Sequence, residues 1–223
     1  DFASRVGKPA NIRMNALAPV AGAPKVPVVY VAGTCMNSGK TAAACMLVKA
    51  LSRAGYRVGA CKLTGVSLIR DILAMRDYGA EWVLDFTDCG IPTSTPESAP
   101  ETARIVFSQL ASHGAEVIVT ETGDGIMGDY GVQAVLSDAE LMERCCAMVL
   151  CANDPVGVAG AVWELRKQYD MAPDVISGPA TDNRVGVRFV EREFGIPAIN
   201  ARTKPLELGA MIVEAVRGKA AKA

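Results

Sequence analysis

The sequence predicts a three-layer α/β fold, in which helices cover both faces of a mostly parallel central sheet. Two patterns lead to this prediction. Short apolar runs rich in valine and isoleucine alternate along the chain with longer stretches of helical periodicity. The runs are apolar at consecutive positions, which is typical of strands that are buried on both faces in a parallel sheet.

Each predicted element is bounded by residues that end strands or helices. The first strand follows Pro27. The helix that begins at residue 40 stops at Gly55 and the helix that begins at residue 98 stops at Gly114, because glycine readily adopts the left-handed conformation after a helix. The predicted strands are residues 28–33, 57–63, 81–86, 116–121, 146–152, 173–178 and 196–200. The predicted helices are residues 40–54, 67–78, 98–114, 157–169, 183–194 and 205–217.

Composition excludes several classes of protein. The 223 residues include 23 Lys and Arg against 24 Asp and Glu without a basic run, so no nucleic-acid partner is indicated. No apolar stretch reaches the roughly 18 residues that a membrane-spanning helix needs, and no signal peptide is recognisable. The seven cysteines form no CxxC pair and there is one histidine, so we expect reduced thiols, no zinc site and a cytoplasmic location.

Residues 1–27 differ from the rest of the chain, because they contain several prolines and show no clear period. We interpret them as a leader or as the tail of an upstream domain. Residues 28–223 then form one domain, in which right-handed crossovers bring the carboxyl ends of all strands to one edge of the sheet. Ligands of such folds bind along that edge.

The segment 28–51, VVYVAGTCMNSGKTAAACMLVKAL, has the pattern of a phosphate-binding loop between a strand and a helix. Main-chain N–H groups of a glycine-rich turn and of the first helical turn can converge on a polyanion. Lys40 then reaches the β- and γ-phosphates, and the Thr41 hydroxyl binds Mg²⁺. This predicts a P-loop NTPase domain. The residues expected to hold the nucleotide are Gly33, Thr34, Asn37, Ser38, Gly39, Lys40 and Thr41.

The loop is spelled GT-x4-GKT, with Gly33 one position earlier than in the common pattern. This spelling resembles the loop of dethiobiotin synthetase and is close to that of the cobyrinic acid diamide synthetases. Two later motifs extend the resemblance over residues 28–131. They are CKLTGVSLIRD, with Lys62, Gly65 and Asp71, and VIVTETGDG, with Glu121, Gly123 and Gly125.

The resemblance implies that Asp71 and Glu121 complete a Mg²⁺ site with Thr41, and that Lys40, Lys62 and Glu121 take part in catalysis. The residue types agree with these roles, because Mg²⁺ prefers carboxylate and phosphate oxygens and a lysine can neutralise a transferred phosphoryl group. Simpler interpretations stay open. Lys62 could be a solvated strand-end lysine, Asp71 a helix-surface acid and Glu121 a satisfied strand-end carboxylate.

The family's activity would be transfer of the ATP γ-phosphoryl group to a small carboxylate-type substrate, which forms an acyl phosphate that an amine attacks. The resemblance also implies a homodimer with the substrate site near the interface. This chain departs from dethiobiotin synthetase at Cys35, Leu63 and Asp124, so we expect a relative with a different substrate. A small-molecule kinase, a regulatory switch ATPase and a nucleotide-binding module of a larger enzyme are the alternatives. The absence of a lysine from residues 34–38 argues against the switch ATPase.

Later strand ends supply further candidates. We expect the nucleotide base near Asn183 or Asp182, with Asn200 as another candidate, although Thr181 or Asp182 could instead cap a helix. The segment 85–98 is either a loop that closes on the substrate, with Asp85 or Asp88 near the metal, or an ordinary surface loop.

Overall fold

The computed structural model describes residues 11–220, which form six strands, eight α-helices and three short 3-10 helices. The strands are β1 (Val28–Gly33), β2 (Val58–Thr64), β3 (Trp82–Asp85), β4 (Val117–Thr122), β5 (Cys145–Cys151) and β6 (Val175–Ser177). The α-helices are α1 (Lys40–Arg53), α2 (Ile69–Asp77), α3 (Ala99–Ser112), α4 (Val132–Leu136), α5 (Ala139–Glu143), α6 (Pro155–Tyr169), α7 (Arg184–Phe194) and α8 (Pro205–Ala220). The 3-10 helices are η1 (Ile12–Asn15), η2 (Phe86–Cys89) and η3 (Pro179–Thr181).

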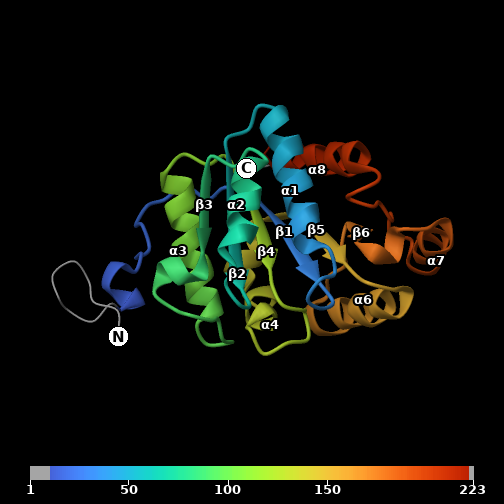
Figure 1. The fold of residues 1–223 in the computed structure, drawn as a ribbon, viewed down its shortest axis with the longest axis horizontal. Helices are drawn as coiled ribbons and strands as arrows, with labels where there is room; N and C mark the ends of the chain where they lie inside the picture. The colour runs from blue at the N-terminus through green and yellow to red at the C-terminus, as the bar shows by residue number, and fades with distance from the viewer. Residues whose placement is uncertain (1–10, 221–223) are drawn as a thin grey trace.

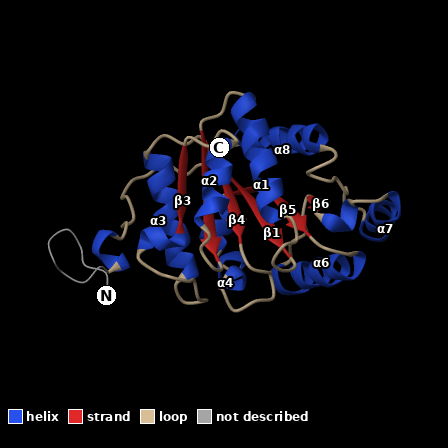
Figure 2. Cartoon of the chain, viewed as in Figure 1, coloured by secondary structure: helices blue, strands red, loops and turns tan. Residues whose placement is uncertain are grey.

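The six strands form one sheet with the order β3-β2-β4-β1-β5-β6, and each pair of neighbouring strands is parallel. Helices α8 and α6 lie on opposite sides of this sheet (Figure 1). Figure 2 shows the strands in red, with helices on both sides of them in blue. The predicted three-layer α/β fold is confirmed. Among the helices of residues 11–220, none has the length and apolar character needed to cross a bilayer.

Each face of the sheet has its own hydrophobic core. One core lies under α1, α2 and α8 and includes Leu47 and Ile212. The other lies under α3, α4, α5, α6 and α7 and includes Phe107 and Leu165. Every residue of β1 is buried, and Tyr30 in the middle of this strand joins the second core. The continuous apolar run of β1 is therefore explained by burial on both faces.

The strand order determines which charged residues meet at the carboxyl edge of the sheet. Strand β4 lies between β1 and β2, although β2 follows β1 in the sequence. In this register Glu121 lies opposite Val31 of β1 on one side and Lys62 of β2 on the other. Asp85, at the end of β3, lies opposite Lys62 on its far side.

Most predicted elements are present with slightly different bounds, but the strand predicted at residues 196–200 is wrong. This segment makes only an isolated bridge between Ile176 and Ala198. It does not continue along β6 because the chain turns at Asn200, whose side-chain oxygen accepts the N–H of Arg202 at 2.9 Å. Helices α4 and α5 are absent from the predicted elements because five residues each are too few for a periodic signal.

The part of the predicted leader that the structure describes lies against α3. The Val20 N–H donates to Ser108 Oγ at 3.0 Å, and Gln109 Nε2 donates to the Ala18 carbonyl at 2.8 Å. Residues 1–10 lie outside the described residues. The domain boundary at residue 28 stays a prediction.

The second core depends on a buried aromatic pair, which provides a test of the packing. Phe107 and Tyr30 are fully buried and meet edge to face, with ring centroids 6.3 Å apart. We expect Phe107→Ala to lower the free energy of unfolding by about 3–5 kcal/mol, because the lost ring leaves a cavity. Val185→Ala on the exposed surface of α7 should change it by less than about 0.5 kcal/mol. Urea denaturation measures both variants, and equal effects would contradict the core position of Phe107.

Candidate nucleotide-binding site

The loop between β1 and α1 winds tightly around its own side chains. A Cβ atom on Gly33 would clash with Ser38 Oγ and would lie 2.8 Å from Lys40 Cδ, so a side chain there would displace Ser38 or Lys40. Asn37 (φ 59°) and Gly39 (φ 95°) adopt left-handed conformations that turn the chain into α1. The predicted unit of strand, glycine-containing loop and helix is therefore present.

This loop and the first turn of α1 leave a series of main-chain N–H groups free. Within residues 11–220, the N–H groups of residues 35–42 meet no protein acceptor, and the Ala43 N–H is the next to donate, to the Gly39 carbonyl at 3.0 Å. Helix α1 has 14 residues, so its N-terminus carries a partial positive charge of about half a unit. Free N–H groups at the start of a helix form an anion-binding site.

Lys40 is buried at the start of α1, and its ammonium group turns back over the loop. The Nζ atom donates to the Cys35 carbonyl at 2.8 Å and to the Asp124 carbonyl at 2.6 Å. Burial lowers the pKa of Lys40, and the Glu121 carboxylate opposes this shift. The lysine thus joins the loop to the β4–α4 connection, at a point from which it can reach a bound phosphate.

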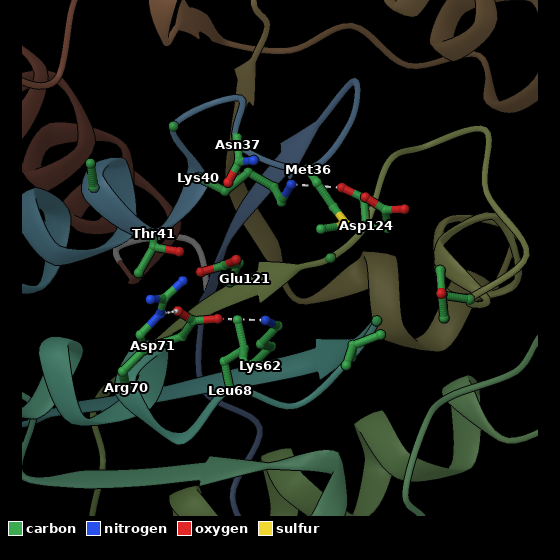
Figure 3. Close-up of a pocket in the computed structure, with 16 residues that line it drawn as sticks. Met36, Asn37, Lys40, Thr41, Lys62, Leu68, Arg70, Asp71, Glu121 and Asp124 are labelled. Carbon is green, nitrogen blue, oxygen red and sulfur yellow. Dashed lines mark hydrogen bonds and ion pairs between the residues drawn. The ribbon is translucent and has the colours of Figure 1, made fainter.

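A second buried lysine lies beside the loop and is paired with an acid. Lys62 Nζ and Asp71 Oδ2 are 2.6 Å apart, and their side chains are 8% and 11% exposed. Asp71 comes from the first turn of α2, so the β2–α2 connection folds back over the end of β2. Figure 3 shows this pair next to Glu121, on the same side of the cavity as Thr41.

Glu121 carries a charge that the protein alone does not fully satisfy. Burial raises the pKa of Glu121, while the Lys62 ammonium and the Thr41 hydroxyl lower it. Four buried side-chain N or O atoms of the described residues lack a hydrogen-bond partner, and three of them belong to Glu121, Ser38 and Asp124. Buried polar groups are nearly always paired in proteins, so this concentration around one loop is typical of a binding site for a polar ligand.

Most of the expected site residues line one cavity of about 310 Å³ (Figure 3). Those that line it are Asn37, Gly39, Lys40, Thr41, Lys62, Asp71 and Glu121. Gly33 and Ser38 are instead buried within the loop, and the Thr34 N–H donates to the Cys151 carbonyl at 3.0 Å. These three residues shape the loop and do not line the cavity.

A second cavity, of about 300 Å³, adjoins the first, because Asn37, Gly39 and Ala42 line both. Its far side contains Asp182 and Asn200, which are two of the residues expected near the base.

Asn183 is not among the residues that line this second cavity. Its side chain accepts the Gly186 N–H at 2.9 Å and caps α7. The capping role considered for Thr181 or Asp182 thus belongs to Asn183. Asn200 instead holds the cavity wall together, because its Nδ2 atom donates to Asp182 Oδ1 at 2.7 Å.

Asp85 and Asp88 do not line the cavity, contrary to the expectation that one of them lies near a metal. Asp85 Oδ1 accepts the Thr87 N–H at 2.7 Å, and Asp88 Oδ2 accepts the Asp85 N–H at 2.9 Å. This reciprocal capping box starts η2 and occupies both acids. Asp85 Oδ2 also accepts the Ser67 hydroxyl at 2.6 Å, so these acids have structural partners.

Arg70, Asp124 and Tyr130 line the first cavity but were not assigned to the site from sequence. Asp124 had a visible signal, since it is an additional acid between two glycines after a strand. Arg70 lies within the CKLTGVSLIRD motif but has no role in it, Tyr130 lies outside the quoted motifs, and only the folding of two connections over the strand ends brings both residues here.

The oxygen atoms of this site suit Mg²⁺, which takes one or two carboxylates together with phosphate and water oxygens. Thr41 offers a hydroxyl, and Glu121 offers an unpaired carboxylate oxygen beside it. Asp71 could contribute only Oδ1, because Oδ2 pairs with Lys62, and Oδ1 itself lies 3.9 Å from Arg70 Nε. Residues 11–220 contain no group of three His, Cys, Asp or Glu that could hold a metal ion.

No protein-family model and no curated protein sequence matches this chain. Solved structures do match. Chloroplast FtsY from Physcomitrella patens has a TM-score of 0.57 at 12% identity, covering 92% of this chain and 70% of that one. HypB from Archaeoglobus fulgidus has a TM-score of 0.55 at 16% identity, covering 87% and 90%. A DUF1611 family protein from Anabaena variabilis has a TM-score of 0.57 at 14% identity, covering 93% and 63%.

This chain has the P-loop NTPase fold. At such low identities the similarity shows the fold alone. The narrower resemblance to dethiobiotin synthetase stays a prediction.

The raised pKa of Glu121 gives a prediction for the ligand-free P-loop protein. We expect Glu121→Gln to raise the free energy of unfolding at pH 7, because the native state there holds a buried, incompletely paired carboxylate. The gain should vanish below the ordinary pKa of 4.5, where the carboxyl group is protonated in both the folded and unfolded states.

Urea denaturation at pH 7 and pH 4 measures this difference. Glu191→Gln, on the exposed surface of α7, should show no such pH-dependent gain. A Glu121→Gln protein that is less stable than wild type at pH 7 would disprove the assigned direction.

Proposed function

We propose that this protein binds Mg²⁺–ATP in the two adjoining cavities and transfers the γ-phosphoryl group to a small carboxylate-type acceptor. The observation that carries the proposal is the set of unsatisfied groups around one loop. The loop beside the first cavity has free N–H groups at residues 35–42, and the cavity is lined by two buried lysines and by Glu121 and Asp124, each of which has an unpaired buried oxygen atom. A triphosphate with a divalent cation would satisfy both the donors and the acceptors.

In this proposal the triphosphate lies along the loop and the start of α1. The N–H groups from Asn37 to Thr41 bind the phosphate oxygens, and Lys40 moves from the Asp124 carbonyl to the β/γ-phosphates. The base occupies the second cavity beside Asp182 and Asn200. Gly33, Thr34 and Ser38 support the loop from within, and Asn183 supports the base site by capping α7.

Thr41 and Glu121 would hold the Mg²⁺ ion, with Asp71 reaching it through Oδ1 or through water. When bound, the ion neutralises charge on the transferred phosphoryl group. Lys62 faces the same space from β2 and would hold the acceptor carboxylate or the transferred group, while its pairing with Asp71 keeps its ammonium group in place. An amine then attacks the acyl phosphate, as in a ligase.

A nucleotide-dependent switch is the second candidate, because apolar side chains are exposed around the mouth of the first cavity. Met36 (62% exposed), Val66 (54%) and Leu68 (45%) line this cavity and come from two different connections at the carboxyl edge. Exposed apolar patches often mark interfaces. We propose that a second copy of this chain covers them, which would make the protein a homodimer with its substrate site near the interface.

We also propose a cytoplasmic location, in agreement with seven cysteines that form no disulfide.

Nucleotide binding can be tested by thermal unfolding. Mg²⁺–ATP at about 100 times its dissociation constant should add roughly 2.7 kcal/mol, which raises Tm by about 5–10 °C for a chain of this size. Lys40→Met keeps the apolar stem but removes the ammonium group, so this shift should be lost. Lys49→Met, on the same helix but outside the first cavity, should keep it. The proposed function fails if wild type shows no shift, or if both variants respond alike.

The acceptor can be sought by measuring phosphate and ADP release from Mg²⁺–ATP with a panel of small carboxylic acids, each with and without an ammonium salt. One acid should stimulate turnover, and Lys62→Met should abolish the stimulation while leaving the ATP-dependent Tm shift in place, because Lys62 is assigned to the acceptor. Stimulation only by a protein partner would favour the switch. Stimulation by an alcohol, with a stable phosphorylated product, would favour a kinase.

A further inference from the structure

The connection after β4 places an acid over the cavity between two closely packed glycines. A Cβ atom on Gly125 would lie 2.5 Å from the Thr34 carbonyl oxygen, and one on Gly65 would lie 3.1 Å from the carbonyl carbon of Gly123. The Thr64 hydroxyl also donates to the Gly123 carbonyl. The main chain on either side of Asp124 is therefore held against the β1–α1 loop and the β2–α2 connection.

The Asp124 side chain makes no hydrogen bond with the described residues. Its Oδ1 atom is buried without a hydrogen-bond partner, although the residue lines the first cavity. Its main-chain carbonyl accepts the Lys40 ammonium at 2.6 Å, which places Asp124 beside the lysine assigned to the β- and γ-phosphates. A free carboxylate oxygen thus lies in the residue next to the Lys40 ammonium, where the proposed function places the γ-phosphate.

The other acids that line the cavity have assigned partners. Asp71 pairs with Lys62, and Glu121 lies beside Thr41 at the proposed metal position. Figure 3 shows Asp124 on the side of the Lys40 ammonium away from Thr41 and Glu121. From this position Asp124 would contact a nucleophile that approaches the phosphoryl group, and it would not contact the metal.

We propose that Asp124 is a catalytic base that orients the attacking nucleophile and accepts its proton; this inference rests on the proposed function. A carboxylate acceptor carries no proton, so in the full reaction Asp124 serves the amine. The C–N bond forms, the bond from carbon to the phosphate oxygen breaks, and phosphate leaves while the surplus proton of the attacking nitrogen passes to Asp124.

Without acceptor and amine, water takes the same place. Its oxygen bonds to the γ-phosphorus, the bond from that phosphorus to the ADP oxygen breaks, and the proton passes to Asp124. Basal hydrolysis therefore reports on Asp124 before any acceptor is known.

The experiment is a single-turnover assay with protein in excess over Mg²⁺–ATP labelled in the γ-phosphate, following phosphate release. Asp124→Asn, which keeps the shape of the side chain, should slow release by about 100-fold or more, the usual contribution of a general base. The Kd for Mg²⁺–ATP should change by less than about threefold, because the interaction is made only on the way to the transition state. The Mg²⁺ concentration for half-maximal release should also stay unchanged.

Asp129→Asn is the matched control, because Asp129 is an exposed acid of the same connection and does not line the cavity. It should release phosphate at the wild-type rate. Equal release by wild type and Asp124→Asn, including no detectable release by either, would overturn the inference. So would a large rise in the Mg²⁺ requirement of Asp124→Asn, which would make Asp124 a metal ligand. Failure of wild type to bind Mg²⁺–ATP would instead refute the proposed function itself.

Discussion

The candidate site depends on the hydrogen-bond register of three parallel strands. Because β4 pairs with β1 on one side and β2 on the other, Glu121 lies in one row with Val31 and Lys62. The strands are buried on both faces, so charged side chains are tolerated only where the row reaches the edge and the cavity opens. A one-residue slip in either pair would turn Lys62 or Glu121 away from its neighbour.

Charge balance follows from this register. Two lysines and two carboxylates are buried within the same cavity, and a buried charge is stable only with a partner. Asp71 satisfies Lys62, while Lys40 uses main-chain carbonyls and Glu121 keeps one oxygen unpaired. The protein alone therefore leaves both signs of charge incompletely neutralised. A polyanion and a divalent cation bound together would complete both.

Close main-chain contacts keep this arrangement rigid. Gly33, Gly125 and Gly178 each lie where a Cβ atom would approach another atom of the site within 2.5 Å. The Gly178 contact is with the Ser38 carbonyl, so the β6 end supports the phosphate loop from the side of the second cavity. Support of this kind would hold the proposed site groups in position without a ligand, which would reduce the entropy lost on binding.

By itself, the sequence determined the fold class and the unit of strand, glycine-containing loop and helix that holds Lys40 and Thr41, because apolar runs and the GKT loop are local patterns. It also placed Lys62, Asp71 and Glu121 at strand ends. Only the tertiary structure decided which strand ends are neighbours, since strand order depends on long-range pairing. In the folded protein, Asp71 and Asp124 line the cavity, whereas Asp85 belongs to a capping box and Asn183 caps α7. These roles depend on which hydrogen-bonding partners the tertiary structure places near each side chain, and local sequence does not specify those partners.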